Sequence, residues 1–164
     1  MEVNKFTVYR IVPFESPVNI GDSVIPSKCK IKGERKERIE EALEENRPAL
    51  YPQRDNCLYV CFSKENAYEW ANIKYGRRNT TYKLLTLEVT GELYWFMSDC
   101  YNLLMESFAQ NKLNEVCVNY WESIIENVSA LKLDKGYEGL FVDKAVVKTI
   151  EYKNYINGES VDVE

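Results

Sequence analysis

The order of strand-like and helix-like segments is the feature of this sequence that most constrains its fold. Short runs rich in β-branched and aromatic residues predict strands, and apolar residues that recur at helical spacing predict helices. Along the chain these segments come in the order β, α, β, α, β, α, α, β, β. Two successive helices followed by two strands break the βα alternation that a doubly wound parallel sheet requires. The order therefore predicts an α+β fold with antiparallel or mixed sheets.

Proline, glycine and turn-forming residues set the limits of the predicted elements. Strands are predicted at residues 6–12, 57–62, 82–90, 137–142 and 146–152, with a further short strand at 93–97 after a turn at Gly91. Helices are predicted at residues 34–46, 64–75, 99–113 and 114–127, the first with an apolar stripe made of Ile39, Ala42 and Leu43. Ser63 is placed to cap the second helix and Asp99 the third. A long loop at 13–33 and a frayed end after a turn at 157 complete the assignment.

The length of the chain bounds its organisation. With 164 residues, of which 45% are hydrophobic, the chain is long enough to bury a sizeable core and fits a single domain over residues 1–164. The 21 basic and 26 acidic side chains give a net charge of −5, which argues against nucleic-acid binding through overall charge.

Charge is distributed unevenly along the chain. The tail at about 157–164 is acidic, whereas basic side chains gather in one run made of Lys28, Lys30, Lys32, Arg35, Lys36 and Arg38. Two glutamates interrupt this run, as is typical of a solvated loop and the outer face of a helix. The alternative is a contact surface for phosphate groups, which would make binding strongly salt-dependent.

Histidine is absent, which excludes Ser-His-Asp and Cys-His catalysis and any histidine metal ligand. The five cysteines are irregularly spaced without a CxxC pair, so neither a zinc site nor a disulfide framework is expected. Cys57 and Cys61 share one face of a predicted strand and are expected to be buried small hydrophobes. A signal-peptide apolar region and a run of 18 apolar residues are both missing, so we expect a reduced, cytoplasmic protein without a membrane span.

Three polar residues lie within or at the ends of predicted strands, where a rigid scaffold can present them to a cleft. Arg10 either pairs with an internal carboxylate or holds a ligand phosphate. Ser63 caps a helix and also leaves a helix N-terminus facing whatever lies beyond the strand. Glu138, flanked by Gly136 and Gly139, is either an exposed strand residue or a carboxylate that stabilises positive charge on a closely approaching ligand.

The joint order of these motifs resembles the ADP-ribosyltransferase-like superfamily, in particular the small bacterial and phage domains of unknown function that share its fold. Arg10 on the first strand, the strand and helix LYVCFSKENAYEWA and the late segment YEGLFVDKAVVKTIE carry the resemblance, over less than a third of the chain. The late segment is expected to be a hairpin whose strands join at Asp143 and Lys144. The resemblance implies two small, mostly antiparallel sheets that frame a cleft, with helices packed outside.

The resemblance also implies site residues. Glu138 corresponds to the catalytic glutamate, Arg10 to the residue that contacts the phosphate or ribose side of NAD, and Ser63 to the residue that orders the nicotinamide ribose. Tyr9, Tyr68 and Tyr75 are candidates to stack on nicotinamide. NAD would be the substrate, and no metal is needed, because a carboxylate can stabilise the oxocarbenium character that develops when the bond to nicotinamide breaks.

Three positions bear on this assignment. Transferases that modify arginine commonly carry Glu or Gln two residues before the catalytic glutamate, where this chain has Gly136, so arginine is a doubtful acceptor. Glu151 is a second possible placement of the catalytic glutamate. Arg54, in the long stretch 13–56, either anchors that stretch or reaches the ligand.

Two functions follow from the resemblance. One is ADP-ribosyl transfer from NAD to a protein or nucleic-acid acceptor, or hydrolysis of NAD. The other is a catalytically inactive binding module for a nucleotide, an NAD-derived ligand or a protein partner, of the kind that would serve in defence or counter-defence between phage and bacterium.

Overall fold

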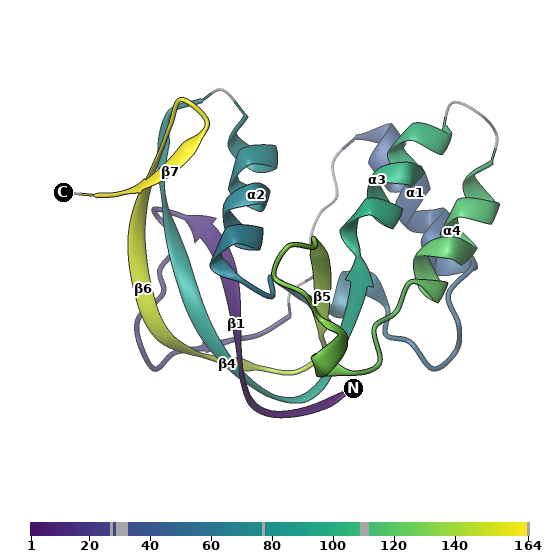
Figure 1. Ribbon diagram of the computed structural model, residues 1–164, viewed down its shortest axis with the longest axis horizontal. Helices are drawn as coiled ribbons and strands as arrows, with labels where there is room; N and C mark the ends of the chain where they lie inside the picture. The colour runs from purple at the N-terminus through teal and green to yellow at the C-terminus, as the bar shows by residue number, and fades with distance from the viewer. Residues whose placement is uncertain (27, 29–32, 77, 109–111, 164) are drawn as a thin grey trace.

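The computed structural model describes residues 1–26, 28, 33–76, 78–108 and 112–163 (Figure 1). The helices are α1 (Glu34–Glu45), α2 (Lys64–Tyr75), α3 (Ser98–Ser107) and α4 (Leu113–Glu122), with 3-10 turns η1 (Arg54–Asn56) and η3 (Val128–Ala130). The strands are β1 (Glu2–Pro13), β2 (Ser23–Val24), β3 (Leu58–Val60), β4 (Thr80–Met97), β5 (Tyr137–Phe141), β6 (Ala145–Ile156) and β7 (Glu159–Asp162). The expected α+β class is confirmed.

The strands of the described chain form one curled antiparallel sheet (Figure 1). The long strand β4 is its centre, because β4 pairs with β1, with β6 and, in its last part, with β5. β3 pairs with β5, while β2 and β7 pair with β6. The two sheets expected from the sequence are thus two sections of one sheet, joined through β4.

Strands β5 and β6 do not form a hairpin, although the sequence predicts one around residues 143 and 144. Leu93 of β4 lies opposite Phe141 of β5, and Glu88 of β4 lies opposite Val146 of β6. β5 and β6 therefore run in the same direction along the same strand, with an interruption between them. The short segment between β5 and β6 therefore interrupts the pairing with β4 but does not reverse the direction of the chain.

The expected turn at Gly91 is wrong, since β4 continues from Thr80 to Met97 without interruption. Gly91 has φ +131°, a conformation that favours glycine, and it lies where the strand passes from one section of the sheet to the other. A glycine inside a strand pattern here marks a bend, not an end.

Further boundaries differ from the expected ones, since β1 begins at Glu2 and α3 ends at Ser107. Asp99 does not cap α3, which begins at Ser98 after Met97 and has Asp99 in its first turn. Helix α4 ends at Glu122, five residues before the expected limit. The tail is not frayed over its whole length, because β7 pairs with β6 after a turn at Asn157 and Gly158, both with positive φ.

The helices cover the sheet in two groups (Figure 1). Helix α2 packs on β1, β6 and β7, whereas α1, α3 and α4 pack on one another beside the β3–β5 section. The predicted apolar stripe of α1, residues Ile39, Ala42 and Leu43, is buried in this second group together with Phe96 and Trp121. The space between α2 and α3, above β5, is where the candidate site is found.

None of the helices in the described ranges is long and apolar enough to cross a membrane.

The buried cysteines are expected to resist alkylation in the folded protein. Cys57, Cys61 and Cys117 are buried free thiols, and burial raises the pKa to about 12 for Cys57 and Cys61 and to about 11 for Cys117. Since the thiolate is the reactive form, treatment with iodoacetamide at pH 8 should modify them only after unfolding in urea. Peptide mass mapping of native and unfolded samples measures this; rapid native labelling of Cys57 or Cys61 would contradict the packing described.

Candidate functional site

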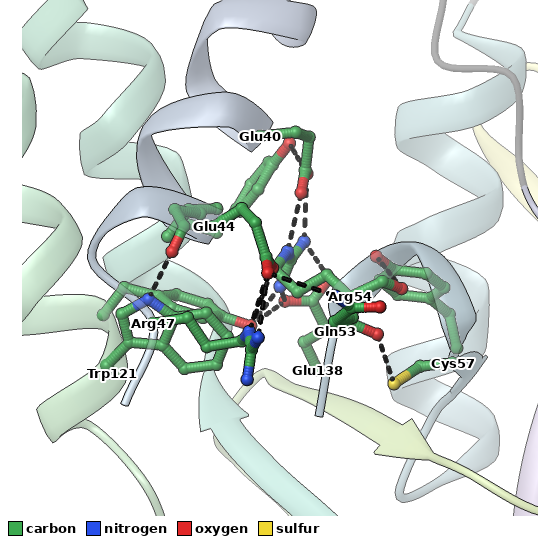
Figure 2. A network of polar contacts seen from close by, with 12 residues as sticks. Glu40, Glu44, Arg47, Gln53, Arg54, Cys57, Trp121 and Glu138 are labelled. Carbon is green, nitrogen blue, oxygen red and sulfur yellow. Dashed lines mark hydrogen bonds and ion pairs between the residues drawn. The ribbon is translucent and has the colours of Figure 1, made fainter. Parts of the chain in front are cut away.

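Arg54 and Glu138 form a buried ion pair between η1 and β5 (Figure 2). The Arg54 side chain is 5% exposed and that of Glu138 4% exposed. Arg54 Nη1 donates to Glu138 Oε2 at 2.8 Å and Nη2 donates to Oε1 at 3.1 Å, so the pair is bidentate. This geometry shows that Arg54 anchors the stretch before β3, one of the two alternatives that the sequence leaves open.

Helix α1 contributes a second carboxylate to the same guanidinium. Arg54 Nε donates to Glu40 Oε2 at 2.8 Å, and Nη2 donates to Glu40 Oε1 at 3.2 Å. Tyr101 of α3 also donates to Glu40 Oε1, at 3.0 Å. The buried arginine is therefore held between two glutamates that come from a helix and from the sheet.

Tyr120 of α4 completes the network on the side of Glu138. Its hydroxyl donates to Glu138 Oε2 at 2.7 Å and also contacts Arg54 Nη1. The rings of Tyr59, Tyr101 and Tyr120 surround the Arg54 guanidinium at centroid distances of 5.4, 5.1 and 4.9 Å. Network residues from α1, α3, α4, β3 and β5 thus meet on one cation.

The charges of this network fix its protonation. Burial lowers the pKa of Arg54, but the negative charges of Glu138 and Glu40 and the neighbouring tyrosine oxygens outweigh it and raise the pKa well above its usual value. Burial, reinforced by Glu138, also raises the pKa of Tyr120 well above its usual range, although Arg54 opposes this shift. Arg54 is therefore cationic and Tyr120 a neutral hydrogen-bond donor at physiological pH.

Glu138 also lines a cleft between α2 and α3, with a volume of about 300 Å³. Helix α2 lines it with one face, because Asn66, Glu69, Trp70 and Ile73 follow the i, i+3, i+4, i+7 spacing of a helix. The start of α3 and the segment that leads into β5 supply the rest, namely Ser98, Asp99, Tyr101, Asn102, Asp134, Lys135 and Gly136. The cleft lies beside the buried ion pair and shares Glu138 with it.

Two buried polar atoms in this cleft have no hydrogen-bond partner, Asn66 Oδ1 and Ser98 Oγ. Asn66 is only 4% exposed; its backbone N–H donates to Ser63 Oγ at 3.1 Å, and its Nδ2 lies 3.5 Å from Glu69 Oε2. Because a carboxylate only accepts hydrogen bonds, the amide nitrogen must face Glu69, which leaves Oδ1 unpaired. An unpaired buried acceptor is costly, so these atoms mark a place where a ligand can donate.

The structure brings the backbones of the three motif residues together. Tyr9, next to Arg10, exchanges backbone hydrogen bonds with Cys61 at 2.9 and 2.7 Å, and β3 pairs with β5 through Val60 and Gly139. The segments that hold Arg10, Ser63 and Glu138 therefore lie side by side in the order β1, β3, β5.

The side chains of the first two residues have defined local roles. Arg10 Nη1 donates to the backbone carbonyl of Tyr59 at 2.6 Å. Ser63 caps α2, as predicted, by accepting from the backbone N–H of Asn66. Both contacts hold the segment from β3 to α2 in place beside β5.

The candidate stacking residues do not line this cleft. Tyr9, Tyr68 and Tyr75 pack together with Cys61 and Ala67 in the apolar cluster beneath α2. The ring of Tyr68 faces Lys153 Nζ at 5.6 Å. Trp70 is the aromatic residue of α2 that lines the cleft.

Glu151, the second possible catalytic glutamate, lies away from this cleft on β6. It forms ion pairs with Lys64 at 2.7 Å and with Lys153 at 3.3 Å. Burial raises the pKa of Glu151, but the two lysines outweigh it and lower the pKa below its ordinary value. Its contacts tie β6 to the start of α2.

The two glycines around Glu138 differ from each other. A Cβ on Gly139 would lie 2.5 Å from Trp95 Cζ3 and 2.7 Å from Val60 Cγ2, so Gly139 makes room for a core side chain. Close approach of a ligand, one of the two alternatives left open by the sequence, does not explain this glycine. A Cβ on Gly136 would meet nothing closer than Ser98 Oγ at 3.4 Å, and Gly136 does line the cleft.

Sequence reasoning missed Glu40, Tyr120, Asn66 and Ser98. Glu40 follows Ile39 directly and so lies beside the apolar stripe of α1, which was a usable signal for a partly buried acid. Tyr120 belongs to an apolar and aromatic stripe at helical spacing, a pattern that predicts a core residue, and its ring is indeed buried. The basic run is described in part only: Lys30 and Lys32 lie outside the described residues, and Arg38 pairs with Glu34 on the surface.

Comparison with family models matches residues 22–150 to one family, whereas comparison with curated proteins gives no match. The matched range covers more than half of the chain and runs from before α1 into β6, so it includes both the Arg54–Glu138 network and the cleft. The chain belongs to the family described as "Protein of unknown function (DUF2441)".

Proposed function

We propose that this chain is a catalytically inactive binding module of ADP-ribosyltransferase-like architecture, which holds a nucleotide or an NAD-derived molecule beside Glu138. The antiparallel sheet, the helices outside it and the cleft at β5 support this architecture. The free thiols of the described cysteines support a cytoplasmic setting.

The observation that carries the proposal is the occupancy of the Glu138 carboxylate. Oε2 accepts from Arg54 and from Tyr120, and Oε1 accepts from Arg54. A carboxylate has about four acceptor positions, so one position on Oε1 is left for a ligand. Because Arg54 already compensates the charge of Glu138, this carboxylate stabilises a developing cation less than an unpaired one would.

Cleavage of NAD, by transfer of ADP-ribose to a protein or nucleic-acid acceptor or by hydrolysis, is the second candidate. The neighbouring positions of Arg10 on β1, Ser63 after β3 and Glu138 on β5 favour it, since these are the motif residues that carry the resemblance. In that function Glu138 would be the catalytic residue.

One experiment separates the two functions. The purified protein is incubated with NAD, and nicotinamide release and the shift in melting temperature are followed for the parent and for Glu138→Gln, with the exposed Glu126→Gln as matched control. We expect a thermal shift with NAD or a related nucleotide and no nicotinamide release. Nicotinamide release that is lost in Glu138→Gln and kept in Glu126→Gln would establish cleavage instead. If neither a thermal shift nor nicotinamide release is seen, NAD is excluded as the ligand.

A further inference from the structure

We propose that the cleft between α2 and α3 binds a small organic cation whose head is a guanidinium group. This inference concerns the side of Glu138 that faces α2 and α3, and it stands whether or not NAD binds to the protein. It rests on the charge of the lining, on unpaired acceptors and on the aromatic wall.

The charge of the cleft selects against anions. The side chains of Glu69, Asp99, Asp134 and Glu138 carry four negative charges there, against the one positive charge of Lys135. Arg54 compensates Glu138 from behind, which leaves the other carboxylates in excess. A cationic group would be attracted to this lining, whereas a phosphate would be repelled, so the phosphates of a nucleotide held beside Glu138 would lie outside it.

The unpaired atoms favour N–H donors, because Asn66 Oδ1 can only accept a hydrogen bond and Ser98 Oγ can accept one. Asn66 Oδ1 and Ser98 Oγ are buried without partners, and Glu138 Oε1 has one acceptor position left. These acceptors come from α2, α3 and β5, so a ligand that satisfies all of them must donate in several directions. A guanidinium has five N–H donors in one plane, while an ammonium group has three on one nitrogen.

The size and walls of the cleft agree with this class. A volume of about 300 Å³ is at the small end of ligand sites. Trp70 and Tyr101 add aromatic surface to the lining, and a guanidinium is weakly hydrated and stacks on aromatic faces. An ammonium group would lose more hydration on entering the same site.

The test uses three probes of equal chain length, butylguanidine, butylamine and butylurea, titrated into the full-length protein by calorimetry and by ligand-observed NMR. Butylurea keeps the planar shape without the charge, and butylamine keeps the charge without the planar donors. We expect butylguanidine to bind at least tenfold more tightly than either. Equal binding of butylurea, equal binding of butylamine, or no binding of butylguanidine would each overturn the inference.

Two variants locate the site. Asn66→Leu and Ser98→Ala each remove one acceptor, and each should weaken butylguanidine binding about tenfold, because a hydrogen bond to a charged group is lost. Glu126→Gln is the control and should bind like the parent. Undiminished binding in Ser98→Ala and in a folded Asn66→Leu would place the probe elsewhere and overturn the inference.

The source of the guanidinium is a separate arm of the same titration. A capped arginine residue that binds more tightly than butylguanidine would indicate an arginine side chain of a peptide, and weaker binding would indicate a free small molecule. Butylguanidine binding without any NAD signal would support this inference and contradict the proposed function. An NAD signal without butylguanidine binding would support the proposed function and overturn this inference.

Discussion

Replacing Arg54 by methionine is expected to lower the free energy of unfolding by about 3–5 kcal/mol, the cost of breaking a buried ion pair from one side. Methionine fills much of the same volume without a charge, so the loss reports on electrostatics more than on packing. The substitution leaves two carboxylates without their cation, Glu138 with 4% and Glu40 with 16% of the side chain exposed. Urea denaturation at pH 7, followed by circular dichroism, measures the change.

The pH dependence of this loss identifies its cause. In Arg54→Met the buried carboxylates relieve their cost by binding protons in the folded state more readily than in the unfolded state. Stability that depends on protons bound in the folded state increases as pH falls. The difference in the free energy of unfolding between the variant and the parent should therefore become smaller as the pH is lowered from 7 to 5. A loss due to packing would not change with pH.

Two controls belong to this experiment. Arg38→Met breaks a surface pair with Glu34, whose side chains are 62% and 84% exposed, and should cost no more than about 0.5 kcal/mol. Adding Glu138→Gln to Arg54→Met should recover part of the loss, because the amide is neutral and still accepts from Tyr120. An Arg54→Met variant as stable as Arg38→Met would contradict the buried network.

The order of elements could be predicted from the sequence because it depends on local patterns. The cap at Ser63 and the apolar stripe of α1 are contained within a few neighbouring residues, and both were found as expected. The pairing of strands could not be predicted in the same way, because it depends on partners far away in the sequence. Nothing near residue 143 distinguishes a reversal from a break in a run along β4, so the expected hairpin was wrong.

The candidate site shows the same division between local and distant information. Arg54 and Glu138 attract attention singly, since each is a charged residue beside a strand-like segment. Their pairing joins positions 84 residues apart in the sequence, which only the tertiary structure defines. Within the sequence Asn66 is an ordinary polar residue of a helix, and its unpaired oxygen depends on its burial in the folded chain beside the cleft between α2 and α3.

Replacing Gly139 by alanine is the second substitution with a large expected effect. The added Cβ would lie 2.5 and 2.9 Å from two ring atoms of Trp95 and 2.7 Å from Val60 Cγ2. Gly139 is paired on both sides, with β3 and with β4, and Trp95 is fully buried, so neither the strand nor the ring can move freely. We expect a loss of about 3 kcal/mol, at the upper end of overpacking costs.

Gly136→Ala is the matched control for this substitution, because a Cβ there first meets Ser98 Oγ at 3.4 Å. Its stability should stay within about 1 kcal/mol of the parent. Urea denaturation of both variants gives the comparison, and equal losses would contradict the steric explanation.

The steric explanation makes one more demand. The two close ring atoms, Cζ3 and Cη2, belong to the outer, six-membered ring of the Trp95 indole. The side chain of phenylalanine reaches less far, so Trp95→Phe removes these atoms. The costs of Gly139→Ala and Trp95→Phe should therefore be less than additive, with alanine at 139 costing about 2 kcal/mol less beside phenylalanine.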